Sequence, residues 1–167
     1  MLPILLSENA RVGLAGQGDA LGRRASLLMG SGVQPVLLAS DAAGEALQGL
    51  ALVFIAGLPD DAARPLAVRA RAAGALVNVE DLTELCDFHV PAIVRRGDLT
   101  LTASTGGKVP GLARRFREWL ETQVGPEWED RVATLSAARL AWRAQGHQPT
   151  DVSRLTRERI AQEGWLS

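Results

Sequence analysis

Short apolar runs alternate with amphipathic stretches over the first 80 residues, and this alternation restricts the fold more than any other feature of the chain. The run 50–56 (LALVFIA) is apolar throughout, which is typical of a strand buried on both faces. Four runs are predicted to be β-strands: residues 10–15, 33–39, 50–56 and 75–79. Strands that alternate with helices through short connections form right-handed βαβ units. We therefore expect an α/β fold with an N-terminal Rossmann-type parallel sheet.

Glycine and proline set the bounds of the elements between these strands. The helix expected over residues 19–29 has basic residues, Arg23 and Arg24, on one face. Its opposite face is apolar and is formed by Leu21, Ala25, Leu28 and Met29. Pro35 predicts that the second strand begins late or lies near an edge of the sheet. Residues 40–48 are expected to form one or two helical turns, and residues 59–73 a second helix.

The pattern changes after Asp81. Residues 89–95 and 99–103 are predicted to be two strands joined by a turn at residues 96–98. Three helices are then expected, over residues 109–124, 127–144 and 150–163. We therefore expect a Rossmann-type domain over residues 1–88 and two smaller parts, a middle segment over 89–125 and a helical C-terminal segment over 126–167.

Composition excludes several classes of protein. The net charge of −1 gives no reason to expect a nucleic-acid or membrane partner. The single cysteine, Cys86, excludes an internal disulfide and a metal site built from several cysteines of one chain. Residues 1–6 lack the basic region and cleavage site of a secretory signal, so a cytoplasmic protein is expected. Basic residues concentrate after Arg95, which favours either an anionic ligand there or a solvated helix face.

A glycine loop, Gly16-Gln17-Gly18-Asp19, follows the first predicted strand and opens the first helix. In that context it is typical of dinucleotide binding: Gly16 permits a tight turn, and Gly18 lets the backbone approach a pyrophosphate. Backbone N–H groups at the helix N-terminus would face the anion. The usual third small residue is replaced by Leu21. The alternative is a glycine-rich turn that binds nothing.

Asp41, next to Ser40, lies just after the second strand and about 20 residues beyond the glycine loop. A carboxylate there would accept hydrogen bonds from an adenosine ribose, which favours NAD over NADP. Asp41 could equally be the N-cap of the short helix that follows. Ala56 and Gly57, at the end of the third strand, are expected to line the cofactor at the carboxyl edge of the sheet.

Several further motifs follow in order along the chain. They are Leu2-Pro3-Ile4, the glycine loop with Arg23-Arg24-Ala25, residues 77–81 (VNVED), residues 86–92 (CDFHVPA), and Ser104-Thr105-Gly106-Gly107-Lys108 with Leu112-Ala113-Arg114. Together they resemble the precorrin-2 dehydrogenase/sirohydrochlorin ferrochelatase family, which forms the N-terminal part of siroheme synthase. The resemblance implies NAD-dependent oxidation of precorrin-2 to sirohydrochlorin by a homodimer, with residues 89–125 as the dimerisation segment. In some members the same site inserts ferrous iron.

The resemblance also implies roles for particular residues. Asp81 matches the family's catalytic acidic residue, which would act as a general base or hold a metal transiently. Without the resemblance, an N-cap of the turn over residues 82–85 is the simpler interpretation. The loop from Ser104 to Lys108 gathers N–H groups, hydroxyls and an ammonium that suit substrate carboxylates, as does Arg114, although the loop could be a structural turn.

Three departures from the family pattern accompany these motifs. Residues 40–49 are short for the family, and Ala56-Gly57-Leu58 replaces a segment that usually ends in a hydroxyl residue. His89 stands where the family is usually apolar; it is expected either to be packed in place or to face the substrate. The short 40–49 stretch favours an alternative function, a non-catalytic NAD-binding or redox-sensing homodimer.

Overall fold

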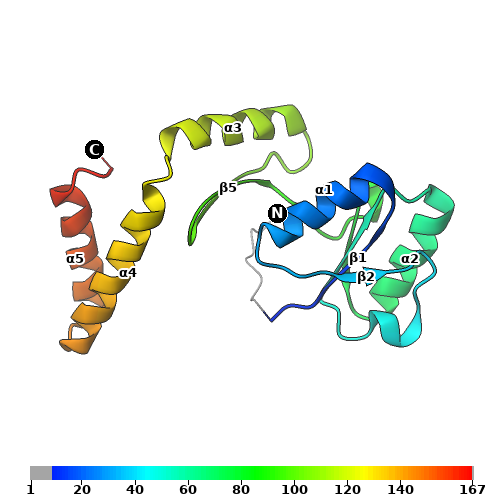
Figure 1. Ribbon diagram of the computed structural model, residues 1–167, viewed down its shortest axis with the longest axis horizontal. Coiled ribbons are helices and arrows are strands. Elements are labelled where there is room, and N and C mark those ends of the chain that lie inside the picture. Colours follow the sequence, from blue (N-terminus) through cyan, green and yellow to red (C-terminus); the bar gives the residue numbers. More distant parts are fainter. Residues whose placement is uncertain (1–8, 167) are drawn as a thin grey trace. The chain divides into compact units, whose positions relative to one another are not determined.

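The computed structural model describes residues 9–166, so the motif Leu2-Pro3-Ile4 and the expectation about residues 1–6 lie outside the described residues. The chain forms two compact units, residues 1–90 and residues 91–167. Figure 1 shows the sheet and its helices in the first unit and the hairpin and three further helices in the second. No helix in the described part combines the length and apolar character needed to cross a membrane.

The first unit is built on a four-stranded parallel sheet with the strand order β2-β1-β3-β4. The strands are β1 (Val12–Gly16), β2 (Val36–Leu38), β3 (Leu52–Ala56) and β4 (Leu76–Val79). The helices α1 (Gly18–Met29) and α2 (Asp60–Ala72) connect them. This arrangement confirms the expected α/β fold. It also places the residues that follow β1, β2, β3 and β4 at one edge of the sheet.

Alternate side chains of β3 explain why its sequence is apolar throughout. Val53 and Ile55 pack in the cluster that includes the alanines and Leu66 of α2. Leu52 and Phe54 pack on the other face, in the cluster that includes Leu28 of α1. Successive side chains of a strand point to opposite faces, so a helix on each face leaves no polar position on this strand.

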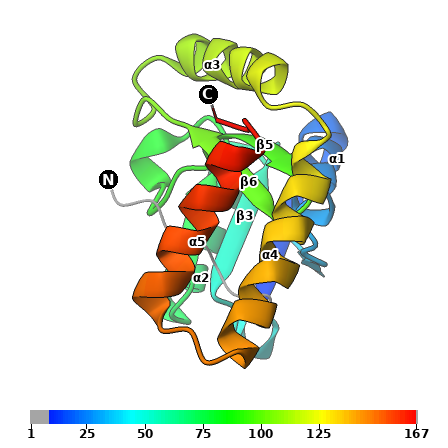
Figure 2. The ribbon, with the colours of Figure 1, turned by 90° about the vertical axis from the view of Figure 1, so that its left-hand side faces the viewer.

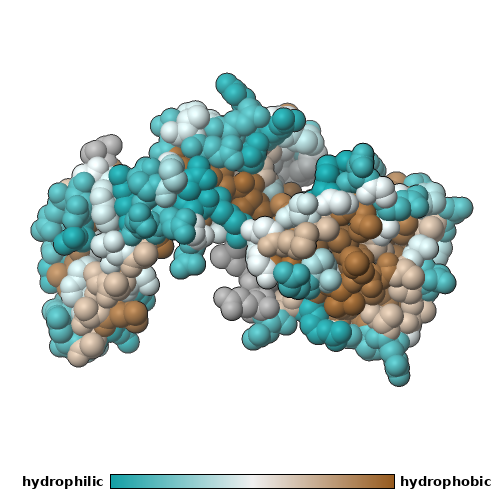
Figure 3. Space-filling view, viewed as in Figure 1, coloured by the Kyte–Doolittle hydropathy of each residue, from teal (hydrophilic) through white to brown (hydrophobic). Residues whose placement is uncertain are grey.

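The second strand is shorter than the pattern predicts. β2 begins only after Pro35 and ends the sheet, which confirms the interpretation of that proline. Within residues 40–48 there is a single 3₁₀ turn, η1 (Gly44–Leu47), and its Leu47 is buried in the core. The side chains of Val36 and Leu37 are 40% and 71% exposed, and Figure 3 shows apolar surface over this edge of the sheet.

The second unit contains an antiparallel hairpin of β5 (Ala92–Arg96) and β6 (Leu99–Ala103), followed by three helices. The helices are α3 (Pro110–Gln123), α4 (Trp128–Ala144) and α5 (Pro149–Gln162). β5 begins three residues later than residue 89, where the sequence pattern placed it, because Pro91 has no N–H to donate to a ladder. Instead, Val90 packs on the core of the first unit.

Little of the second unit is buried. Among its described residues only Val94 and Val152 are buried hydrophobic side chains. α3 packs on the hairpin, and α4 and α5 lie side by side (Figure 2). The guanidinium carbon of Arg131 in α4 lies 4.9 Å from the centre of the Trp128 ring and 5.5 Å from the ring centre of Trp165, which follows α5. The apolar stripe of α3 is half exposed.

Candidate functional site

The glycine loop is held against the end of β3 by direct backbone contact. Gly16 pairs with Ala56, and a Cβ atom added at Gly16 would collide with the carbonyl oxygen of Ala56. The N–H of Gln17 donates to the same oxygen at 3.1 Å. A Cβ added at Gly57 would lie 2.6 Å from the carbonyl oxygen of Gln17. Gly16 and Gly57 are therefore both required because two backbone segments contact each other directly. For Gly16 this reason differs from the expected one, which was that it permits a tight turn.

Gly18 has a different environment. Its φ is +61°, in the left-handed region, and a Cβ added there would meet nothing within 4 Å. Gly18 opens α1, and its N-cap Gln17 makes no side-chain hydrogen bond to the first turn. The first turn of the helix therefore has no side-chain cap, and the space beside Gly18 is open. This is the arrangement that a pyrophosphate requires, so the residues present fit a dinucleotide.

The departure at Leu21 has a structural reason. Leu21 is partly buried and packs on the cluster formed by β1, β3 and α1. At this position a larger apolar side chain fills space between helix and sheet, where the usual fingerprint has a small residue.

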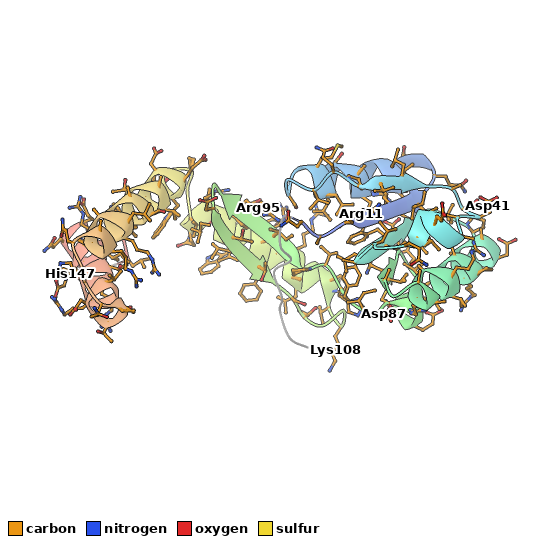
Figure 4. All side chains as sticks on the ribbon, turned by 90° about the horizontal axis from the view of Figure 1, so that it is seen from below. Arg11, Asp41, Asp87, Arg95, Lys108 and His147 are labelled. Carbon is orange, nitrogen blue, oxygen red and sulfur yellow. The ribbon has the colours of Figure 1, made fainter. Side chains whose placement is uncertain are left out.

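Asp41 lies in the exposed loop that follows β2, the outermost strand of the sheet (Figure 4). The N-cap of η1 is Ala43, and no side chain caps that turn, so Asp41 is not its N-cap. The loop is fixed from α2. The Nε of Arg69 donates to the carbonyl of Ala42 at 2.8 Å, and its Nη2 donates to the carbonyl of Ser40 at 3.1 Å.

Asp81 directly follows Glu80 at the carboxyl end of β4 and is exposed. Its φ is +63°, and among the described residues it is the only non-glycine residue in the left-handed region. The 3₁₀ turn that follows, η2 (Thr83–Leu85), has Leu82 as its N-cap and no side-chain cap, so the N-cap interpretation of Asp81 is wrong. Residues held in this conformation concentrate at functional sites.

Basic residues of α1 contact the same edge of the sheet. The Nη2 of Arg23 lies 3.5 Å from a carboxylate oxygen of Glu80. The guanidinium carbon of Arg24 lies 5.1 Å from the centre of the Phe54 ring, and burial lowers the pKa of Arg24 while Glu80 opposes that shift. The sequence pattern placed Arg24 opposite the apolar face of the helix and Met29 on that face. The structure differs, because Arg24 is half-buried and Met29 is 50% exposed.

The loop between β6 and α3 contains the predicted carboxylate-binding residues. The N–H of Gly106 donates to the Ser104 hydroxyl at 3.1 Å, and the N–H of Val109 donates to the Thr105 hydroxyl at 3.0 Å. Gly106 and Gly107 have φ values of +63° and +79°. The loop is thus a well-defined turn. Both hydroxyls accept hydrogen bonds within it, so their protons can still be donated to a ligand.

Two cations accompany this loop. Lys108 is exposed, and its side chain extends away from the ribbon in Figure 4. Arg114 is also exposed, and its Nε lies 3.3 Å from Glu118. Hydrogen bonds from Arg115 and then Arg114 lower the pKa of Glu118. A substrate carboxylate would therefore compete with Glu118 for Arg114.

His89 is half-buried next to Phe88, whose ring packs edge-on against Phe54 with centroids 5.2 Å apart. Over residues 9–166, no group of three or more His, Cys, Asp or Glu side chains is placed to hold a metal ion. Within the first unit, the structure brings the predicted cofactor residues and Asp81 to one edge of the sheet. The residues from Ser104 to Arg114 lie together in the second unit.

Comparisons with known proteins agree with this architecture. Residues 4–92 match a family model described as "Putative NAD(P)-binding". A siroheme synthase of Methylobacillus flagellatus is 36% identical over 157 residues, which cover 81% of this chain and 33% of the relative. A siroheme synthase of Ectopseudomonas mendocina is 34% identical over 139 residues, covering 69% of this chain and 30% of that protein. The chain therefore spans about a third of the length of these relatives.

A solved structure has the same fold. It is named SirC, precorrin-2 dehydrogenase, and it superposes with a TM-score of 0.72 at 19% sequence identity. The superposition covers 96% of this chain and 89% of the other.

Proposed function

Because the chain belongs to the NAD(P)-binding family whose model matches residues 4–92, and because siroheme synthases are among its relatives, we propose that it oxidises precorrin-2 to sirohydrochlorin with NAD. The proposal rests on the uncapped first turn of α1, where a Cβ added at Gly18 would meet nothing within 4 Å, and on Asp81 at the same edge of the sheet. The first feature suits a dinucleotide, and the second provides a carboxylate where ligands bind in open α/β sheets.

In this proposal the cofactor is held by three loops at the carboxyl edge of the sheet. N–H groups from Gly18 onward donate to the pyrophosphate, and the carboxylate of Asp41 accepts from a ribose hydroxyl. Ala56 and Gly57 form the wall beside the glycine loop. Bound NAD supplies a hydride acceptor.

Asp81 is proposed to remove the proton. Conversion of precorrin-2 to sirohydrochlorin removes two hydrogen atoms, one as a hydride and one as a proton. An exposed carboxylate at the end of β4 can take that proton and release it to water. Asp81 acts as a base in this step, and ferrous iron is treated only as a substrate of insertion, which is tested separately below.

The substrate carries several carboxylates, and the second unit offers groups that bind them. The Ser104 and Thr105 hydroxyls, the N–H groups of Gly106 and Gly107, and the side chains of Lys108 and Arg114 are proposed as partners. His89 is proposed as a further substrate-binding residue.

We also propose a homodimer formed through α3. Leu112, Phe116 and Trp119 are each about half exposed and line one open hollow together with Arg115. Covering such an apolar helix face removes it from water. Trp119→Asp is therefore expected to convert the dimer to a monomer in analytical ultracentrifugation, whereas Leu140→Asp, at an exposed position on α4, should leave the mass unchanged. A monomeric parent protein would contradict the dimer.

The function is tested by adding NAD and precorrin-2 to the purified protein under anaerobic conditions and following NADH. Turnover is expected, and Asp81→Asn should reduce kcat by about 100-fold or more while NAD binding is retained. A folded protein that binds NAD but forms no NADH would contradict the proposal and favour a non-catalytic NAD-binding dimer.

Iron insertion is tested separately. Ferrous iron and sirohydrochlorin are supplied as substrates, and the siroheme absorbance is recorded for the parent protein and for Asp81→Ala. Insertion that is unaffected by Asp81→Ala would show that this carboxylate does not handle the metal.

A further inference from the structure

The loop that carries Asp81 is closed at its base by one residue, Asp87. The N–H of Val77, in β4, donates to a carboxylate oxygen of Asp87 at 2.8 Å. The N–H of Asp87 donates back to the carbonyl of Val77, also at 2.8 Å. These two bonds join the ends of the segment 78–86, so the chain returns from the loop to pair with Val77 inside β4.

A cation from α2 completes this closure. The Nε of Arg71 lies 3.0 and 2.9 Å from the two carboxylate oxygens of Asp87, and its Nη2 donates to the carbonyl of Leu85. The side chains of Arg71 and Asp87 are 34% and 28% exposed, so this ion pair is better shielded than a typical surface pair. One guanidinium thus ties the loop to the helix that packs on the sheet.

Further hydrogen bonds lie inside the loop. The Sγ of Cys86 accepts from the N–H of Val79 at 3.3 Å and lies 3.2 Å from the carbonyl of the same residue. The buried amide of Asn78 donates to the carbonyl of Phe88 at 2.9 Å. These contacts fix the segment on both sides of Asp81, whose own side chain remains exposed.

We propose that Asp87, held by Arg71, is a positioning residue that keeps Asp81 in its left-handed conformation at the carboxyl end of β4. A left-handed backbone is uncommon outside glycine, and although aspartate adopts it more readily than most residues, such a residue is usually held there by the surrounding structure. The two bonds to Val77 and the ion pair to Arg71 supply that restraint. This inference rests on the proposed function, in which Asp81 takes the proton.

Three variants test the proposal. Asp87→Ala removes the side-chain bond to Val77 and the ion pair, whereas Asp87→Asn keeps one oxygen that can accept from the Val77 N–H but loses the charge and one of the two acceptors facing Arg71. Glu84→Gln is the matched control: Glu84 lies in the same loop and pairs with Arg64 at 2.8 Å, but both side chains are about half exposed. Each variant is examined by hydrogen exchange of the amides of residues 77–86, by NAD titration, and by kcat and KM.

Asp87→Ala is expected to speed amide exchange across the loop and to lower kcat by about 10- to 100-fold, because a displacement of about 1 Å is enough for such a loss. The NAD dissociation constant should stay within about twofold, since the glycine loop lies on other strands. Asp87→Asn should fall between Asp87→Ala and the parent, and Glu84→Gln should match the parent.

The proposal is overturned if Asp87→Ala keeps the parent kcat, or if kcat and NAD binding fall together, which would indicate general unfolding. If the parent protein shows no turnover, the proposed function has failed, and the exchange measurement alone decides the structural claim. Unchanged exchange of the loop amides in Asp87→Ala would then overturn it, and faster exchange would support it.

Discussion

Two glycines in one loop are required for different reasons, and alanine substitutions at Gly16 and Gly18 separate those reasons. At Gly16 the new Cβ would collide with a backbone carbonyl that already accepts the Gln17 N–H. Overpacking costs about 1–3 kcal/mol, and the upper end applies because the obstructing atom is fixed by strand pairing. The less flexible unfolded chain offsets about 0.4–1 kcal/mol. Gly16→Ala is therefore expected to destabilise the first unit by about 2 kcal/mol.

At Gly18 nothing obstructs the added Cβ, and only the left-handed backbone opposes it. That conformation costs about 1–2 kcal/mol, and the same offset from the unfolded chain of about 0.4–1 kcal/mol applies. The net loss is about 0–1.6 kcal/mol by this reasoning. The new Cβ would, however, occupy the space assigned to the pyrophosphate. Gly18→Ala is therefore expected to weaken NAD binding by about tenfold or more while the protein stays folded.

Hydrogen exchange of the first unit's amides, followed as a function of urea concentration, measures both values. All four tryptophans lie between residues 119 and 165, so their fluorescence reports the second unit, and hydrogen exchange of the β1 and β3 amides reports the first. Fluorescence should be unchanged in both variants, which makes it an internal control. Equal destabilisation by the two substitutions would refute the assignment of Gly16 to backbone contact and of Gly18 to the cofactor.

Three further predictions concern the loop of Asp41 and the ion pairs of α3. Arg69→Ala removes two hydrogen bonds from the loop of Asp41 and should weaken NAD binding about tenfold in calorimetric titration, whereas Arg64→Ala, at an exposed pair on the same helix, should not. Asp41→Ala should reduce the preference for NAD over NADP, measured as the ratio of the two dissociation constants; an unchanged ratio would exclude a ribose contact. Arg115 and Arg114 hold the pKa of Glu118 below its usual range. Because the folded value is the lower one, this pairing stabilises the protein above the unfolded pKa and is lost as the pH falls through the folded pKa. Glu118→Gln should therefore slightly flatten the acid side of a plot of Tm against pH, and high salt should remove the difference.

The fold could be predicted largely because local patterns agreed with tertiary packing. The apolar run ending at Ala56 predicted a strand covered on both faces, and α1 and α2 cover it. Pro35 predicted the late start of β2 because proline cannot donate to a ladder. The errors arose where the burial of a side chain depends on residues far away in the sequence. The periodicity of α1 could not show that the ring of Phe54 lies beneath Arg24, because that ring comes from a strand thirty residues away.

The candidate site was predictable in the same uneven way. The glycine loop has a local signature, so its position at the end of β1 followed from the sequence. The left-handed backbone of Asp81 had no such signature, and neither did the role of Asp87. Both depend on bonds across ten residues of chain and on Arg71 from another element. Residues 86–92 indicated a motif, but the motif did not show what its aspartate binds.

The short edge strand has a consequence for the protein at high concentration. An exposed edge offers unpaired N–H and C=O groups to a strand of another molecule, and apolar side chains such as Leu37 make that addition more favourable. β2 has only three residues, and Pro35 directly before it lacks a donor. The template for edge-to-edge aggregation is therefore short and is blocked at one end, so the protein can expose apolar surface there without inviting a growing β-sheet.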